Sequence, residues 1–148
     1  MQKILPTLEA LADEAEAFVA GLTPRDDSAT LVTLTGELGA GKTSFTQALA
    51  KALGVSEHVT SPTFVLEKIY ELPEAIGRGF ERLVHIDAYR LEGADALEPL
   101  GFAGTMQDPK NLVVLEWPER VADALPDAAH AITLAVLPDN ARSISYAS

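Results

Sequence analysis

The stretch "GELGAGKTS", residues 36–44, fits the pattern G-x-x-x-x-G-K-[ST] at every fixed position. Those positions are occupied by Gly36, Gly41, Lys42 and Thr43. Glycines let the backbone wrap around an anion, successive N–H groups and a helix N-terminus face the anion, and the lysine reaches its outer phosphates. The threonine hydroxyl is available to Mg²⁺. The pattern therefore predicts a phosphate-binding loop.

The segments on either side of the loop support this prediction. The apolar run "TLVTLT", residues 30–35, predicts a strand before the loop. Residues 42–54 predict a helix that ends at Gly54, with apolar residues at helical spacing: Phe45, Ala48, Leu49, Ala52 and Leu53. A glycine turn before an ordinary amphipathic helix is the simpler alternative. The complete pattern between a strand and a helix favours phosphate binding.

Length and composition indicate one domain, residues 1–148. The 148 residues are 47% hydrophobic, enough for a sizeable core, and no linker or low-complexity stretch divides them. The absence of cysteine excludes disulfides and thiolate metal sites and fits a reducing compartment. Acidic residues interrupt the N-terminal segment, and no apolar run approaches membrane-spanning length. We therefore expect a cytoplasmic protein without membrane contact.

The chain is strongly acidic, with a formal net charge of -11 at pH 7. Nucleic-acid phosphates are neutralised by clustered Lys and Arg, so this balance opposes independent binding to RNA or DNA. If RNA takes part in the function, we expect a partner protein to hold it.

The remaining pattern predicts alternating helices and strands. A first helix begins near Thr7 and has an apolar face formed by Leu8, Leu11, Ala15, Phe18, Val19 and Leu22. Strands are expected in "TSPTFVLEKIYEL", "RLVHIDAY", "NLVVLEW", "AITLAVL" and "RSISY", and helices in "ADALEPLG" and "PERVADALP". Two hairpin-like connections indicate antiparallel strands at the edge of the sheet. The predicted fold is an α/β P-loop NTPase domain with a mixed parallel/antiparallel sheet flanked by helices.

Two acidic residues end predicted strands: Asp87 closes "LVHID" and Glu116 closes "LVVLE". In an α/β sheet, ligands collect at the carboxyl ends of the strands, where the phosphate loop also lies. One carboxylate there can help to hold Mg²⁺, and the other can orient or deprotonate an attacking water. Either acid alone is more often a solvated strand end. Beside a phosphate loop, both become candidates for catalysis.

These motifs together resemble the TsaE family, also called YjeE. The resemblance rests on four segments in this order: "GELGAGKTSFTQALA", "TSPTFVLEKIYE", "HIDAYRLEG" and "VVLEWPER". It runs from about Leu31 to Arg142. It implies a small P-loop ATPase that binds ATP with Mg²⁺ and acts with TsaD-like and TsaB-like partners in threonylcarbamoyladenosine modification of tRNA. From the residues themselves we expect slow hydrolysis alone with stimulation by the partners, and tRNA contact only through the complex. We expect no threonylcarbamoyl transfer by this chain, because 148 residues show no second catalytic pocket or substrate-sized domain.

The family's roles transfer to the matching positions of this chain. The resemblance places the nucleotide beside Trp117 and against the loop residues Glu37, Leu38, Gly39, Ala40, Gly41, Lys42, Thr43 and Ser44. The implied catalytic residues are Glu116, Asp87 and Lys42, and the implied metal ligands are Thr43, Asp87 and Glu116. A loop that switches with the nucleotide is implied at Thr60, Ser61, Pro62 and Thr63. Which carboxylate holds the metal and which orients water stays open.

Several positions keep two interpretations. Trp117 is either a nucleotide contact or a core indole at a strand end. Tyr89 and Arg90 either brace Asp87 or are a structural tyrosine and a solvated arginine. The three histidines have no metal-like spacing and are interpreted as structural or surface groups: His58, His85 and His130.

The match departs from the family in two places. The family usually carries an acidic pair after its "LG", where this chain has Phe102, Ala103 and Gly104. This difference weakens any expectation of a charged partner contact in that loop. Ala88 stands where leucine is common, and we expect this change to affect only packing.

Other functions share the phosphate loop. A small-molecule kinase generally needs an arginine-rich lid over ATP, and the sequence has no arginine cluster between its predicted elements. A non-hydrolysing nucleotide-binding scaffold would have nearly the same sequence. A GTP-binding switch protein would need "NKxD" after a core strand, which this sequence lacks. No arginine is evidently aimed at the phosphate loop, which leaves room for activation by a partner.

Overall fold

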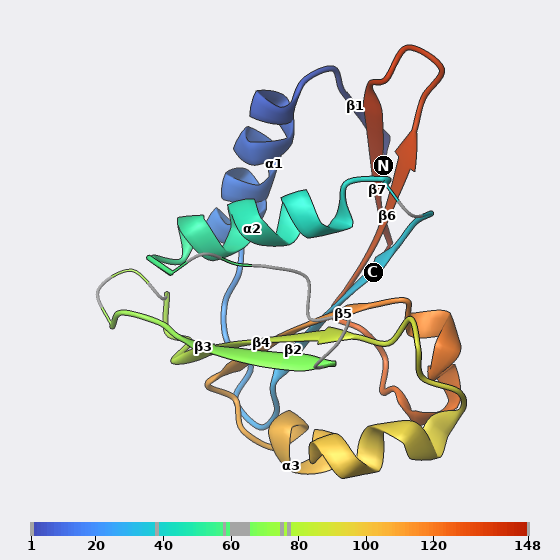
Figure 1. Cartoon of the computed structure of the whole chain (residues 1–148). Helices are drawn as coiled ribbons and strands as arrows, with labels where there is room; N and C mark the ends of the chain where they lie inside the picture. Colours follow the sequence, from blue (N-terminus) through green and yellow to red (C-terminus); the bar gives the residue numbers. More distant parts are fainter. Residues whose placement is uncertain are drawn as a thin grey trace.

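A computed structural model of the chain describes residues 2–37, 39–57, 59, 66–74, 76 and 78–147. Within them, seven strands form one sheet in the order β1-β7-β6-β2-β5-β4-β3 (Figure 1). The strands are β1 (Gln2–Leu5), β2 (Thr30–Thr35), β3 (Glu67–Glu71), β4 (Arg82–Asp87), β5 (Asn111–Glu116), β6 (His130–Val136) and β7 (Arg142–Ala147). The α-helices are α1 (Leu8–Ala20), α2 (Lys42–Ala52) and α3 (Phe102–Met106), and the 3-10 helices are η1 (Ala94–Leu100), η2 (Pro118–Arg120) and η3 (Ala122–Ala124).

The central strands are parallel and the outer strands are antiparallel. β2 pairs in parallel with β5 and β6, and β5 pairs in parallel with β4. β3 joins β4, β7 joins β6, and β1 joins β7, all antiparallel. The mixed sheet with antiparallel edges confirms the predicted fold class. β1 was not predicted, because it has four residues and pairs with a strand from the other end of the chain.

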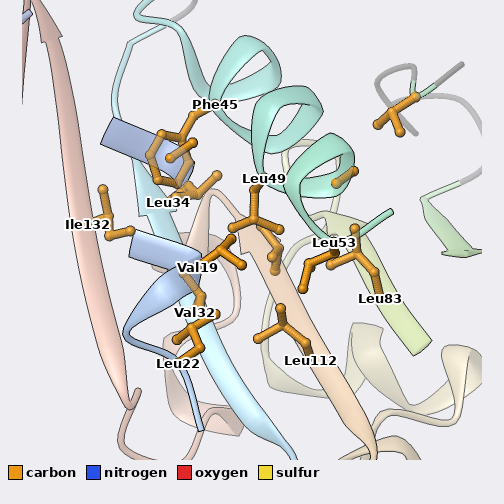
Figure 2. Packing of buried hydrophobic residues seen from close by; sticks show 14 of the residues in the cluster. Val19, Leu22, Val32, Leu34, Phe45, Leu49, Leu53, Leu83, Leu112 and Ile132 are labelled. Atoms are coloured by element: carbon orange, nitrogen blue, oxygen red, sulfur yellow. The ribbon is translucent and has the colours of Figure 1, made fainter. Parts of the chain in front are cut away.

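The long helices α1 and α2 cover one face of the sheet (Figure 1). Figure 2 shows the packing beneath α2, where its residues Phe45 and Leu49 meet Leu34 of β2 and Leu112 of β5, all of them fully buried. Removing such a side chain, as in Leu49→Ala, costs about 2–5 kcal/mol because a cavity remains. This packing holds the first turn of α2 at the end of β2.

The first helix begins where predicted. The hydroxyl oxygen of Thr7 accepts a hydrogen bond from the Ala10 N–H at 3.0 Å and caps α1. Most of the predicted apolar face is buried or half-buried: Leu11, Ala15, Phe18, Val19 and Leu22. Leu8 is the exception, at 72% exposed. It lies in the first turn of α1, on the rim of the cavity described below.

Short helices cover the other face of the sheet, where one of the two predicted helices is present and the other is divided. "ADALEPLG" forms η1, and "PERVADALP" forms η2 and η3 instead of one α-helix. In an α-helix the Arg120 carbonyl would accept from the Ala124 N–H. It accepts instead from the Gly93 N–H at 3.0 Å, while Ala124 donates to Val121 at 2.9 Å. A tertiary contact therefore replaces the helical hydrogen bond.

The strand predicted in "TSPTFVLEKIYEL" begins at Glu67, directly after Leu66, which has a left-handed φ of 68°. Residues 60–65 lie outside the described part of the chain, and with them Phe64, which was expected in this strand. Across the residues that the structure describes, every helix is too short or too polar to cross a membrane.

Candidate functional site

The phosphate loop joins the end of β2 to the start of α2, as predicted. Gly41 is the N-cap of α2 with a φ of 106°, a left-handed conformation that side chains disfavour, and its carbonyl accepts from the Phe45 N–H at 2.8 Å. Gly36 is required for a different reason. A Cβ there would lie 2.5 Å from the carbonyl oxygen of Leu134 in β6. A side chain at either glycine would therefore displace the loop.

A cavity of about 290 Å³ opens beside this loop, at the carboxyl ends of the parallel strands. The loop and the first turn of α2 line it with Gly39, Gly41, Lys42, Thr43 and Ser44. The ends of β4 and β5 line it with Asp87, Tyr89, Glu116 and Trp117. The structure thus brings together residues that the sequence places in separate motifs.

Not every predicted nucleotide-binding residue lines the cavity. Glu37 is exposed and Ala40 is buried, and neither belongs to its lining. Leu38 lies outside the described residues. So does the predicted switch loop: Thr60, Ser61, Pro62 and Thr63.

Asp87 and Glu116 are register partners on the adjacent parallel strands β4 and β5. They are buried, at 4% and 2% exposed respectively. The Tyr89 N–H donates to Oδ1 of Asp87 at 2.9 Å, and the Ala88 N–H donates to the Glu116 carbonyl at 3.0 Å. The first bond holds the Asp87 carboxylate and the second joins the two strand ends, so both acids lie at one end of the sheet and line the cavity beside the phosphate loop.

Lys42 is the first residue of α2 and is only 5% exposed. Its Nζ donates to the Gly36 carbonyl at 2.5 Å and lies 3.5 Å from the centre of the Trp117 ring. Burial lowers the pKa of Lys42, and nearby carboxylates partly oppose this shift: Glu116, Asp87 and Glu119. An ammonium group with so little water around it interacts strongly with an anion. We call Lys42, Asp87 and Glu116 the charged wall of the cavity.

Trp117 has a left-handed φ of 61°, which is uncommon for a large side chain. Its N–H donates to the Leu34 carbonyl of β2 at 3.2 Å, and this bond turns the chain across the end of that strand. The ring lies 4.9 Å from the ring of Tyr89, which in turn lies 5.4 Å from the Arg120 guanidinium. Trp117 both lines the cavity and packs against the core of the opposite face. Trp117 therefore packs as a core indole and also lines the cavity, so the packing is compatible with both interpretations of this residue.

The tyrosine after Asp87 braces that carboxylate through its backbone. Tyr89 donates its N–H to Asp87, while its ring packs on Trp117. Arg90 is exposed. Tyr89 therefore supports the Asp87 carboxylate through its backbone N–H, as one of its two interpretations held.

A third wall of the cavity, formed by Leu8, Leu11 and Arg142, was not predicted. A Cβ on Gly41 would lie 3.7 Å from Leu11 Cδ2 and 3.8 Å from Arg142 Nε, so both side chains border the phosphate loop. Arg142 donates through Nη1 to the Asn140 carbonyl at 2.6 Å, and its Nε is buried without a hydrogen-bond partner among the described residues. Arg142 therefore corrects the expectation that no arginine is placed at this loop.

Two of the three histidines lie within the described residues. His85 is fully buried, and its Nε2 lies 2.5 Å from Oε2 of Glu116. The ring centre of His130 lies 5.0 Å from that of Phe18. His58 lies outside the described residues. His85 and Asp87 lie two residues apart on the same predicted strand, whereas Glu116 lies on another predicted strand and no sequence spacing relates it to His85.

The donors of the cavity suit Mg²⁺. The hydroxyl of Thr43 and the carboxylates of Asp87 and Glu116 are hard oxygen ligands. Mg²⁺ usually keeps several waters and is held by one or two carboxylates together with nucleotide phosphates. It does not require a cluster of three or more acidic or histidine side chains, and the described residues form none. Gly39 leaves open space for a ligand, because a Cβ there would meet nothing within 4 Å.

Known sequences resemble this chain over most of its length. The family model of the threonylcarbamoyl adenosine biosynthesis protein TsaE matches residues 6–144. The tRNA threonylcarbamoyladenosine biosynthesis protein TsaE of Treponema pallidum is 38% identical over 121 residues, which are 82% of this chain and 84% of the relative. The proteins of the same name from Streptomyces coelicolor and Bacillus subtilis are 44% and 34% identical. Those two matches cover 66% and 78% of this chain and 62% and 68% of the relatives.

A solved structure has the same fold. The crystal structure of Bacillus subtilis YdiB matches with a TM-score of 0.77 at 26% identity, covering 99% of this chain and 83% of that chain. The family model spans the phosphate loop, both strand-end carboxylates and the third wall. The chain therefore belongs to the TsaE family of threonylcarbamoyl adenosine biosynthesis proteins.

Proposed function

We propose that this chain is a Mg²⁺-dependent ATPase that supports threonylcarbamoyladenosine modification of tRNA together with TsaD-like and TsaB-like partners. Family membership supports the pathway. One observation carries the ATPase: Lys42, Asp87 and Glu116 line a single cavity next to the phosphate loop. Burying three ionisable groups is costly, and a loop that only connected two elements would not need them.

In this proposal each residue of the charged wall has a task. The N–H groups of the loop and of the first turn of α2 bind the outer phosphates, and Lys42 exchanges the Gly36 carbonyl for a phosphate oxygen. Thr43 and Asp87 would hold the metal. Mg²⁺ bound there would offset the charge that develops on the transferred phosphoryl group. Glu116 would share the metal or orient the attacking water.

The third wall would receive the base and ribose. Leu8 offers exposed apolar surface to a purine ring, with Leu11 buried beside it, and most ligand-binding cavities combine such surface with a few polar groups. Arg142 adds a guanidinium beside Gly41 that can stack on a base or donate to the nucleotide. The cavity can thus accommodate a nucleotide across its two sides, with phosphates on one and base on the other.

Hydrolysis by the isolated chain is proposed to be slow and to be stimulated by the partners. Phosphoryl transfer depends on charge placed around the transferring group, and a second protein often completes that charge. A chain with a net charge of -11 is poorly suited to bind tRNA itself, so tRNA contact is assigned to the partners. Threonylcarbamoyl transfer is assigned to them as well, because the cavity described above has the chemistry of a phosphate site.

The proposal is tested by measuring ATP affinity and phosphate release, with and without Mg²⁺ and with and without the two partner proteins. We expect Mg²⁺-dependent ATP binding, slow release alone and faster release with partners. Binding without turnover in any combination would indicate a nucleotide-binding scaffold, and phosphate transfer to a small molecule would indicate a kinase. Salt-dependent tRNA binding by the isolated chain would contradict the assignment of tRNA contact to the partners.

A further inference from the structure

His85 occupies a core position on β4, with apolar Val114 as its register partner on β5 and Lys68 as its register partner on β3. It lies on β4 between Leu83 and Asp87, and alternate residues of a strand face the same side. Leu83 belongs to the core beneath α1 and α2, and so does Val114, the register partner of His85 on β5. His85 is 0% exposed. An imidazole enclosed in this way needs a hydrogen-bond partner to offset its loss of water.

Glu116 is that partner. The His85 Nε2 lies 2.5 Å from Oε2 of Glu116, and Nδ1 is buried without a hydrogen-bond partner among the described residues. A carboxylate oxygen accepts, so we assign the ring proton to Nε2. Glu116 lines the cavity, whereas His85 lies behind it and is not part of the lining. The hydrogen bond of the ring is therefore directed at the rear of a cavity carboxylate.

We propose that His85 is a positioning residue for Glu116. The terminal torsion of a glutamate side chain is broad, and a donor fixed in the core restricts it. With Oε2 held by the imidazole, the other carboxylate oxygen is available to the metal, as is usual for groups that orient metal ligands. This inference rests on the proposed Mg²⁺-dependent ATPase, because Glu116 has such a task only there. In the competing account, His85 only fills the core, so its shape matters and its donor does not.

Two amide substitutions test whether the hydrogen-bond donor of His85 matters or only the shape of its side chain. In His85→Gln the amide nitrogen can reach the place of Nε2, whereas in His85→Asn it reaches only the place of Nδ1. The measured quantity is Mn²⁺ affinity in the presence of ADP, which does not depend on turnover. We expect a loss of about 10- to 100-fold in His85→Asn and a clearly smaller loss in His85→Gln. Nucleotide affinity without metal should change little in both, and His130→Asn is the matched control on β6.

A double-mutant cycle tests whether the effect passes through Glu116. In the Glu116→Gln background, His85→Asn should cause no further loss of Mn²⁺ affinity. Thermal unfolding reports whether each variant folds, and His85→Leu, which fills the core without a donor, replaces His85→Asn if that variant does not. Each of three results overturns the inference. The first is wild-type Mn²⁺ affinity in the variant that lacks the donor, and the second is an equal loss of affinity in both amide variants. The third is a loss that His85→Asn still causes in the Glu116→Gln background. A wild-type protein that binds no Mn²⁺ with ADP overturns the proposed function instead.

Discussion

The charged wall and the third wall face the same cavity but come from different parts of the sequence. Lys42, Asp87 and Glu116 each lie in or next to a strand of the parallel core, within a motif that can be recognised locally. Leu8, Leu11 and Arg142 come from α1 and β7, elements near the two ends of the chain. The difference suggests a division of tasks. In the proposed function, chemistry depends on the centre of the sheet, and recognition of the rest of the nucleotide depends on α1 and on β7, which lies next to the edge strand β1.

The largest effect is expected from Lys42→Ala. Loss of the ammonium group removes a charge aimed at the phosphates, so partner-stimulated phosphate release should fall by about 100-fold or more, with weaker ATP binding. Folding should be preserved, because a buried charge is not needed by the core. Calorimetric ATP titration and phosphate release check this. Lys51→Ala, at an exposed position of the same helix, is the matched control. Equal behaviour of the two variants would exclude the charged wall as a phosphate site.

A large but more selective effect is expected from Glu116→Gln. Glutamine keeps the shape of the side chain but carries no charge and cannot accept the proton of an attacking water. Partner-stimulated hydrolysis should fall by about 100-fold while ATP affinity is spared. Phosphate release and nucleotide affinity are measured on the same preparation, and Glu119→Gln, an exposed carboxylate three residues along, serves as control. Turnover like that of wild type would make Asp87 the leading candidate for the catalytic carboxylate.

A moderate effect is expected on the third wall, and it should appear in affinity alone. Leu8 is 72% exposed, so Leu8→Ser should leave the free energy of unfolding nearly unchanged. Loss of part of an apolar contact with the base should weaken ATP binding about fivefold, or about 1 kcal/mol, with the turnover number preserved. Ile69→Ser makes the same change at a residue 54% exposed on the far edge strand. If both variants bind ATP alike, the third wall does not receive the nucleotide.

The contrast between the walls also explains how much of the site the sequence could predict. The glycine pattern specifies its own backbone, and α2 begins at Lys42 directly after the left-handed Gly41. The acids at the ends of two apolar strands meet because parallel strands end at the same edge of a sheet. The local glycine pattern and the rule for parallel strands were together sufficient to predict the charged wall. The fold class follows for the same reason, since the buried runs that form β2, β4 and β5 are apolar on both faces.

The remaining features depend on contacts between distant segments. Arg142 reaches the loop because β7 pairs with β6, and no spacing in the sequence marks an arginine at the start of the last strand as a cavity residue. The hydrogen bond from His85 to Glu116 links two strands whose register is set only in the folded sheet. The helices predicted on the second face became 3-10 turns because short segments lack the length to hold an α-helix against tertiary hydrogen bonds.

The smallest effect concerns the charge state of Lys42, and it has opposite signs for stability and binding. Burial lowers the pKa of Lys42 below the ordinary value of 10.5, so between the two values the unfolded chain binds more protons than the folded one. The free energy of unfolding contributed by this residue therefore rises with pH as 10.5 is approached. Relative to Lys42→Met, the wild type should gain stability in this window, while its ATP affinity falls because the ammonium group loses its proton. Denaturant unfolding and ATP titration from neutral pH to about 10.5 measure both quantities, with Lys51→Met as control. A stability difference that does not change with pH would show that the lysine is not desolvated.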